Sequence, residues 1–196
     1  MEIDQHFQSP ILKEFLPDLA SKIDPLCNKY IEEVKKPSEV VYHSNPLYKD
    51  PEFKELVDYI KNKSLAFLDF QGFKLSNHNL IFTEMWVQEF SEKGFGHHDI
   101  HVHWNNHISG FFFLRSSLES SYPVFQDPRA GALMSKLPLK DPDDVSYGSD
   151  TIFYSVQPGA FLLFNSYMPH YFPVDKFNKP FRFIHFNLQA IPKDIS

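Results

Sequence analysis

The part of the chain after Gly72 consists of short apolar runs, and this pattern limits the folds that are open to it. The runs are rich in Phe, Ile and Val, and Gly, Pro, Asn or Asp separates them. Such spacing predicts antiparallel strands packed as a sandwich or barrel. The predicted strands cover residues 80–90, 98–104, 107–114, 122–126, 151–157, 160–165 and 181–189.

The first third of the chain has a helical pattern instead. Apolar residues recur at helical spacing over Pro17–Lys36 and again over residues 51–69. Residues 1–15 are expected to be irregular or to hold a short strand, and Val40–Tyr42 to form another. Two helices followed by a β-rich region is therefore the predicted architecture.

At 196 residues the chain suits one domain. We expect a single domain over residues 1–196, with residues 1–72 as helical support and residues 73–196 as the β core. Within that core, residues 116–150 contain four prolines and an Asp-rich stretch. This segment is too long for a plain turn, so it predicts a loop or lid.

Charge and cysteine content exclude several classes of protein. The net charge is −6 and no run of Lys or Arg accumulates, so the sequence offers no electrostatic support for nucleic-acid binding. The single cysteine, Cys27, cannot form an internal disulfide, which indicates a reducing compartment. Neither a secretory signal nor an apolar run of membrane-spanning length is evident. The expected location is the cytoplasm, with no membrane partner.

Histidines supply the clearest chemical signal. Five of the ten histidines lie between positions 97 and 107. In a strand, residues two apart point to the same face, so His101 and His103 are predicted to project together. A third ligand from a neighbouring strand would complete a metal site. His170 is the candidate, because it follows the apolar run Gly159–Phe164 through a turn that contains Pro169.

Arg182 follows twelve residues after His170. A guanidinium near a metal can pair with a carboxylate through two hydrogen bonds. The order of H-x-H, a distal histidine and an arginine is the layout of an iron site that uses a keto acid. Three protein ligands leave two positions for the keto-acid chelate and one for dioxygen. Imidazoles bind several metals equally well, so Arg182 is the argument for iron with 2-oxoglutarate.

Four blocks of the chain resemble one family. They are His101–Leu114 (H-x-H, then Ser-Gly and aromatics), Phe125–Arg129 (F-x-D-P-R), Pro158–His170 and Phe181–Asn187, which is similar to a closing R-x-S-x-S-F-N strand. In this order they resemble a family of 2-oxoglutarate/Fe(II)-dependent oxygenases found in bacteria and in phages of marine bacteria. The resemblance covers roughly residues 84–190.

The resemblance implies a mainly β protein with N-terminal helices and a double-stranded β-helix (jelly-roll, cupin-like) core. It implies Fe(II) and 2-oxoglutarate as requirements. The reaction would be an oxidation, usually a hydroxylation, of an unidentified small molecule or protein side chain, with release of succinate and CO₂. A homodimer is compatible with it. If the chain is phage-encoded, the host cytoplasm is the implied location.

The sequence departs from the usual pattern at the metal ligands. Most such oxygenases have H-x-D where this chain has His101-Val102-His103. A literal H-x-D occurs earlier, at His97-His98-Asp99, so His97, Asp99 and His170 form an alternative ligand set. The set with His101 and His103 is preferred, because its spacing to Ser109-Gly110 fits the family.

Further residues are predicted around this site. If Arg182 points into the barrel, His185 points outward and has a structural role. Ser166 and Asn105 are candidates to bind the keto acid, although Asn-Asn also marks a turn. The predicted substrate pocket includes Trp86, His107, Phe112 and Tyr167. Two other functions stay open: a cupin-like three-histidine enzyme that uses no keto acid, and a non-catalytic β-sandwich.

Overall fold

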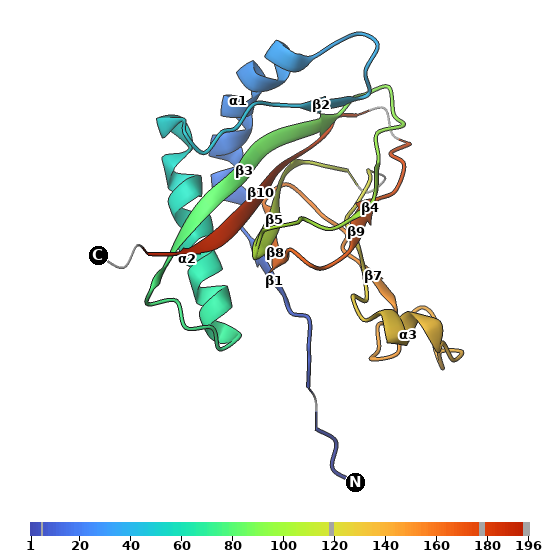
Figure 1. The fold of residues 1–196 in the computed structure, drawn as a ribbon. Coiled ribbons are helices and arrows are strands. Elements are labelled where there is room, and N and C mark those ends of the chain that lie inside the picture. Colours follow the sequence, from blue (N-terminus) through green and yellow to red (C-terminus); the bar gives the residue numbers. More distant parts are fainter. Residues whose placement is uncertain (5, 118–119, 177–178, 194–196) are drawn as a thin grey trace.

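Two antiparallel sheets face each other and form the body of the protein (Figure 1). The computed structural model describes residues 1–4, 6–117, 120–176 and 179–193. The larger sheet has the strand order β1-β8-β5-β10-β3-β2, and the smaller sheet has the order β4-β9-β6-β7. The strands are β1 Ile11–Phe15, β2 Val41–His43, β3 His78–Phe90, β4 His98–His101, β5 Ile108–Arg115, β6 Val124–Gln126, β7 Thr151–Phe153, β8 Ala160–Asn165, β9 His170–Phe172 and β10 Phe181–Pro192.

The chain passes back and forth between the sheets from β3 onward. Strands β3, β5, β8 and β10 belong to the large sheet, whereas β4, β6, β7 and β9 belong to the small one. All pairings are antiparallel, including the long β3–β10 ladder. Eight strands wound in this way form a double-stranded β-helix, so the predicted fold is confirmed.

Two helices cover the outer face of the large sheet (Figure 1). They are α1, Pro17–Val34, and α2, Lys54–Phe70, which follows the single turn η1, Pro51–Phe53. Proline at the first helical position suits α1 and η1, because its missing N–H would have no partner there. Both helices lie close to their predicted bounds. No helix among the described residues is long and apolar enough to cross a membrane.

The large sheet is buried on both faces, which gives the protein two apolar cores. One core lies between the sheet and the helices, and the other lies between the two sheets. In β10, Arg182, Ile184 and Phe186 face the helices. Phe183 and His185 face the space between the sheets. A strand that is buried on both faces has a nearly continuous apolar sequence, and β10 follows this pattern.

Three details of the predicted secondary structure were wrong. Strand β4 ends at His101, so His103 lies in the following turn and not on the strand. The short strand β9 begins at His170, where only a turn was predicted. The segment 116–150 includes the short helix α3, Ala130–Met134. Short elements carry too little periodicity to be recognised in a sequence.

Arg182 joins β10 to α1 and does not face the barrel interior, so its predicted orientation was wrong. Its Nε and Nη2 donate to Oε2 of the buried Glu89 at 2.7 and 2.6 Å. Its Nη1 donates to Asp24 Oδ1 at 2.9 Å and to Asn28 Oδ1 at 2.8 Å. The side chain of Arg182 is only 3 % exposed. This guanidinium therefore fixes the helix to the sheet.

The Arg182→Gln variant tests this structural role. It leaves the carboxylate of Glu89 buried without its main partner, which typically costs about 3–5 kcal/mol of unfolding free energy. Arg129→Gln is the control, because Arg129 is exposed and pairs with Asp127 at the surface; this change is expected to cost about 1 kcal/mol or less. Urea unfolding measures both. Equal stabilities of the two variants would contradict the role of Arg182.

Gly110 allows the close approach of β5 to its two neighbours. A Cβ at this position would collide with the ring of Phe186 and would lie 2.6 Å from the carbonyl oxygen of Leu162. We expect Gly110→Ala to lower the unfolding free energy by about 1–3 kcal/mol or more, because the packed ring and backbone cannot move away. Gly131→Ala is the matched control, since nothing lies within 4 Å of its Cβ position. Thermal unfolding that gives the same shift for both variants would count against this packing.

Candidate metal centre

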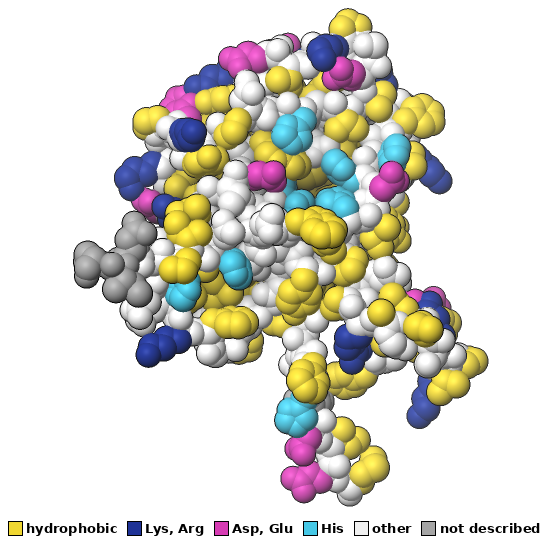
Figure 2. Space-filling model, viewed as in Figure 1, with side chains coloured by type: hydrophobic (Ala, Val, Ile, Leu, Met, Phe, Trp, Pro, Cys, Tyr) yellow, Lys and Arg dark blue, Asp and Glu magenta, His cyan; other side chains and the backbone are white. Residues whose placement is uncertain are grey.

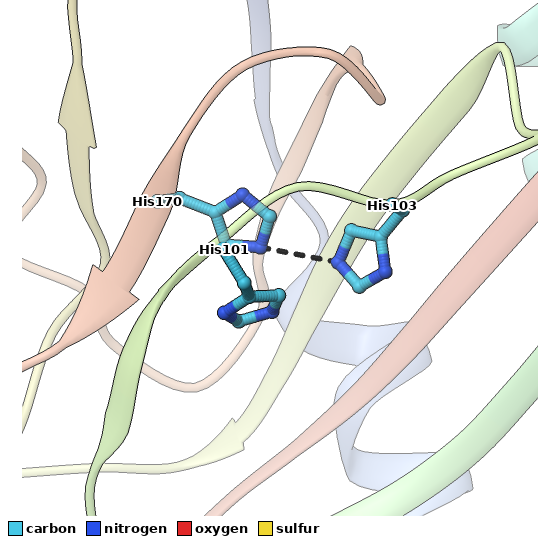
Figure 3. A group of neighbouring side chains, drawn as sticks. All are labelled: His101, His103 and His170. Atoms are coloured by element: carbon cyan, nitrogen blue, oxygen red, sulfur yellow. Dashed lines mark hydrogen bonds between the residues drawn. The ribbon is translucent and has the colours of Figure 1, made fainter.

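Three imidazoles from two adjacent strands and one turn meet at the open edge between the sheets. His101 ends β4 and pairs in register with His170, the first residue of β9. His103 follows in the turn after β4, and its Nε2 lies 3.2 Å from His170 Nε2. Figure 3 shows the three rings converging on a common point. One nitrogen from each ring lies within 4.8 Å of the others, a spacing that suits a metal ion.

Backbone carbonyls set the tautomers of two of these histidines. His170 Nδ1 is 2.9 Å from Met168 O, and His101 Nδ1 is 2.7 Å from Asp99 O. A carbonyl oxygen only accepts hydrogen bonds, so each Nδ1 carries the proton. In both rings the lone pair is therefore on Nε2, the nitrogen that can bind a metal. This is the usual outer-shell arrangement of metal-binding histidines. In the metal-free protein His170 Nε2 faces His103 Nε2 at 3.2 Å.

His103 is held by a different set of contacts. Its backbone N–H donates to Ser166 O at 3.1 Å, and its Nδ1 lies 3.0 Å from Asn187 Nδ2. Asn187 Nδ2 also donates to Glu84 Oε2 at 2.7 Å, while its Oδ1 accepts from Ser109 Oγ at 2.6 Å. In this arrangement His103 Nδ1 accepts, so Nε2 carries the proton. Metal binding at Nε2 requires that proton to leave or the Asn187 amide to turn over.

Burial keeps four of the histidines here uncharged: His98, His103, His170 and His185. Desolvation, and to a smaller extent the neighbouring histidines, lower the pKa of His98 and His103 to about 4 each. Desolvation also lowers the pKa of His170 to about 3. The pKa of the fully buried His185 falls well below its usual value for the same reason. Neutral imidazoles can donate a lone pair to a metal at neutral pH, whereas imidazolium ions cannot.

His185 and Glu84 are site residues that the sequence did not reveal. The predicted outward orientation of His185 was wrong, because its ring stacks on His103 with centroids 4.5 Å apart. Glu84, His103 and His185 form a second group whose ligand atoms lie within 4.8 Å of one another. Both groups use His103. Within the described part of the chain, neither ring nitrogen of His185 has a hydrogen-bond partner.

A wider ring of histidines surrounds this centre, and Figure 2 shows them gathered around a depression in the surface. Trp86 lies between His43 and His185, at centroid distances of 3.9 and 4.7 Å. His98 Nε2 lies 2.5 Å from Gln88 Nε2. Glu84, Trp86 and Gln88 alternate on β3, so one face of that strand lines the site. This two-residue spacing was the available signal for Glu84.

Two of the predicted pocket residues have other roles. Trp86 lies against the histidine cluster. Phe112 does not, because it is fully buried in the core between the large sheet and the helices. His107 is exposed, and its Nδ1 accepts from the backbone N–H of Ala190 at 3.1 Å. This tautomer-dependent contact ties the start of β5 to the end of β10.

Ser166, Tyr167 and Asn105, also predicted around the site, have the following positions. Ser166 is buried, and its Oγ is 2.8 Å from Ser109 Oγ. Its backbone carbonyl accepts the hydrogen bond from the backbone N–H of His103. Tyr167 is 54 % exposed, with its hydroxyl 3.4 Å from Asn165 Nδ2. Asn105 is exposed and has a φ of 60°, which identifies it as a turn residue.

The structure does not bring the alternative ligand set together. His97 and Asp99 belong to neither of the two ligand groups found among the described residues. His97 Nδ1 lies 3.1 Å from Phe95 O, and its ring is exposed. Asp99 contributes its backbone carbonyl to the site, as the acceptor for His101. Its role is thus to orient a ligand.

Arg182 was the predicted anchor of the keto acid, and the structure corrects this interpretation. The closing motif R-x-S-x-S-F-N is one residue longer than the segment from Arg182 to Asn187. When its last two residues are placed on Phe186 and Asn187, its arginine falls on Phe181. Phe181, Phe183 and His185 face the space between the sheets, whereas Arg182 faces α1.

Comparisons with known proteins agree with this architecture. Residues 84–187 match the family described as "Putative 2OG-Fe(II) oxygenase". A prolyl-4-hydroxylase from Pseudomonas putida has 12 % sequence identity and a TM-score of 0.61, and 91 % of each chain is covered. The α-ketoglutarate-dependent carbocyclase SnoK of nogalamycin biosynthesis has 10 % identity and a TM-score of 0.66, with 94 % of this chain and 82 % of that chain covered.

A third similar structure, HygX from Streptomyces hygroscopicus, contains nickel and 2-oxoglutarate. It has 11 % identity and a TM-score of 0.61, with 95 % of this chain and 84 % of HygX covered. No curated protein sequence matched the chain at a significant level.

The fold is a double-stranded β-helix, and its histidine cluster could hold a metal ion. Because the family match covers more than half of the chain, the protein belongs to the 2-oxoglutarate/Fe(II)-dependent oxygenases. The cofactor and cosubstrate of this family are Fe(II) and 2-oxoglutarate. The three histidines suit the metal, because one nitrogen from each ring lies within 4.8 Å of the others. The Nδ1 contacts of His101 and His170 leave Nε2 of each ring as the possible ligand.

The buried neutral histidines make the stability of the metal-free protein dependent on pH. His98, His103, His170 and His185 have depressed pKa values in the folded state, and their ordinary value is about 6.5 when unfolded. Between about pH 4 and 6.5 the unfolded chain therefore binds more protons. The contribution of these histidines to the unfolding free energy should be fully present above pH 6.5. It should decline as the pH falls below that value.

Urea unfolding at pH 7, 6 and 5 measures this decline. In His185→Leu the slope should be smaller by up to one proton, or about 1.4 kcal/mol per pH unit. A stability that stays constant from pH 7 to pH 5 would contradict the neutral state of this cluster.

Proposed function

We propose that His101, His103 and His170 bind Fe(II), and that the protein oxidises an unidentified substrate at this centre. The reaction would be the hydroxylation typical of the family, with 2-oxoglutarate converted to succinate and CO₂. The observation that carries the proposal is the convergence of three imidazoles, two of which have their Nε2 lone pairs set by backbone carbonyls. A random cluster of surface histidines would lack these contacts.

The bound iron supplies the activation of dioxygen, and the protein supplies position and surroundings. His170 is 1 % exposed, so its ring is held rigidly against Phe111, Phe125 and Phe164. His101 is the least buried ligand, which leaves the metal accessible from the mouth of the barrel. Trp86 on the wall of the same mouth is positioned to contact a substrate. An apolar wall on one side and an open mouth on the other suit an oxidation that must exclude side reactions.

A second function is favoured by one specific observation. Arg182, the residue expected to distinguish a keto-acid enzyme from other histidine metalloenzymes, bonds Glu89 and Asp24 on the opposite face of β10. A cupin-like three-histidine enzyme without a keto acid would need no such cation. Formation of succinate from 2-oxoglutarate, coupled to substrate oxidation, distinguishes the two functions.

Metal binding by untagged protein tests the ligand set. His101→Ala and His170→Ala should each weaken the binding of Fe(II) or Co(II) at least 100-fold, because each removes a free Nε2 lone pair from the centre. His97→Ala is the control and should bind the metal as tightly as the unmodified protein. Anaerobic equilibrium dialysis followed by metal analysis gives the affinities. Loss of metal in His97→Ala together with retention in His101→Ala would instead support the alternative ligand set.

A further inference from the structure

The barrel interior beyond the metal ligands is filled with phenylalanine rings. Phe181 and Phe183 of β10 pack with Phe90, Phe113 and Phe172 at centroid distances of 4.8–6.5 Å. Each of the five is at most 2 % exposed. A water-filled cavity would leave accessible surface on the rings that line it. A ligand bound to the metal therefore has no space to extend inward between the sheets.

No lysine or arginine of the described strands points into this interior, where it could pair with a carboxylate. Among the described strands, only Lys13, Arg115 and Arg182 are cationic. Arg115 and Arg182 bond Asp24 on the helix side of the large sheet. Lys13 lies on the edge strand β1, is exposed, and has its Nζ 5.8 Å from the ring centre of Tyr154. The third arginine, Arg129, bonds Asp127 at the surface.

The polar groups at the inner end of the site are an imidazole and an amide. His185 has two ring nitrogens without partners among the described residues, and the same holds for Gln88 Oε1. Both residues are fully buried. They can form hydrogen bonds to a metal-bound ligand, but neither is the guanidinium or ammonium group that would pair with a second, buried carboxylate.

These observations lead to an inference that rests on the proposed function. We propose that the keto-acid subsite of this protein opens toward the mouth and does not select for a second carboxylate. A 2-oxo acid binds through its keto oxygen and its adjacent carboxylate, and its remaining atoms lie outward beside Trp86 and His43. Short monocarboxylic 2-oxo acids such as pyruvate then serve as well as 2-oxoglutarate, and Phe181 and Phe183 determine this specificity.

The reaction balances with such an acid. Pyruvate, dioxygen and a substrate C–H bond give acetate, CO₂ and a C–OH group. The bond between the carboxylate and keto carbons of pyruvate breaks, and the keto carbon is oxidised to a carboxylate. One oxygen atom enters the acetate and the other enters the substrate. Dioxygen is reduced by four electrons, two from the keto acid and two from the substrate.

Direct binding distinguishes this subsite from one with a buried cation. The anaerobic Fe(II) protein is titrated with 2-oxoglutarate and with pyruvate, and the visible charge-transfer band of the chelate reports binding. Dissociation constants that agree within about threefold are expected. A buried guanidinium or ammonium partner would favour 2-oxoglutarate by roughly 10- to 100-fold, so a preference of that size would overturn the proposal.

Two variants test directly whether Arg182 contacts the cosubstrate. Arg182→Lys keeps the buried positive charge beside Glu89, and Arg115→Lys is its matched control on the same face. Both should leave the ratio of the two dissociation constants unchanged. A selective loss of 2-oxoglutarate binding in Arg182→Lys would show that Arg182 reaches the cosubstrate and would overturn the inference.

The failure of the proposed function is distinguishable from failure of the inference. A protein that binds no metal contradicts the proposed function at its first step. A protein that binds Fe(II) normally but gives no band with either acid contradicts the keto-acid subsite and leaves the metal centre intact. A strong preference for 2-oxoglutarate contradicts the inference alone.

Discussion

Strand β10 lies in the large sheet between β3 and β5, and from Phe181 to Leu188 both of its faces are buried. Its side-chain alternation therefore assigns each residue to one of two buried environments. Arg182 lies on the helix side, where Glu89, Asp24 and Asn28 satisfy its guanidinium. Phe181, Phe183 and His185 lie on the side of the metal centre. The character of the site depends on this division, because a shift of one residue would exchange the two sets.

Placement of Arg182 beside the helices follows from the cost of burying charge. A guanidinium between the sheets would meet only aromatic rings and neutral imidazoles, whereas on the helix side it meets two carboxylates. A buried ion must be paired and hydrogen-bonded to be tolerated. The carboxylates come from α1 and β3, so the helical segment stabilises β10 and with it the inner wall of the site.

Hydrogen bonds to backbone carbonyls and to one side-chain amide orient the imidazoles of the candidate metal centre. Backbone carbonyls orient His101 and His170, and the amide of Asn187 contacts both His103 and Glu84. A site with three imidazoles leaves the full charge of a divalent metal uncompensated. Glu84 is the nearby carboxylate that can offset it from outside the ligand set. The site thus combines a neutral inner wall with one negative group at its mouth.

Much of the fold and part of the site could be predicted from the sequence. The periodicity of the apolar residues determined both long helices and most strands, because a strand buried on both faces and an amphipathic helix leave clear patterns. The spacing of His101, His103 and His170 was sufficient to make them candidate metal ligands, and the structure adds that the three rings converge.

The tertiary structure alone decided which face of β10 meets the metal. Arg182 and His185 are both polar residues in one apolar run, and nothing in that run shows which of them points inward. The register of β10 against β3 and β5 settles it, because Arg182 is placed opposite Glu89 and near α1. The sequence by itself determined the class of site; the pairing of strands decided its lining, since the direction of a side chain in a doubly buried strand depends on long-range partners.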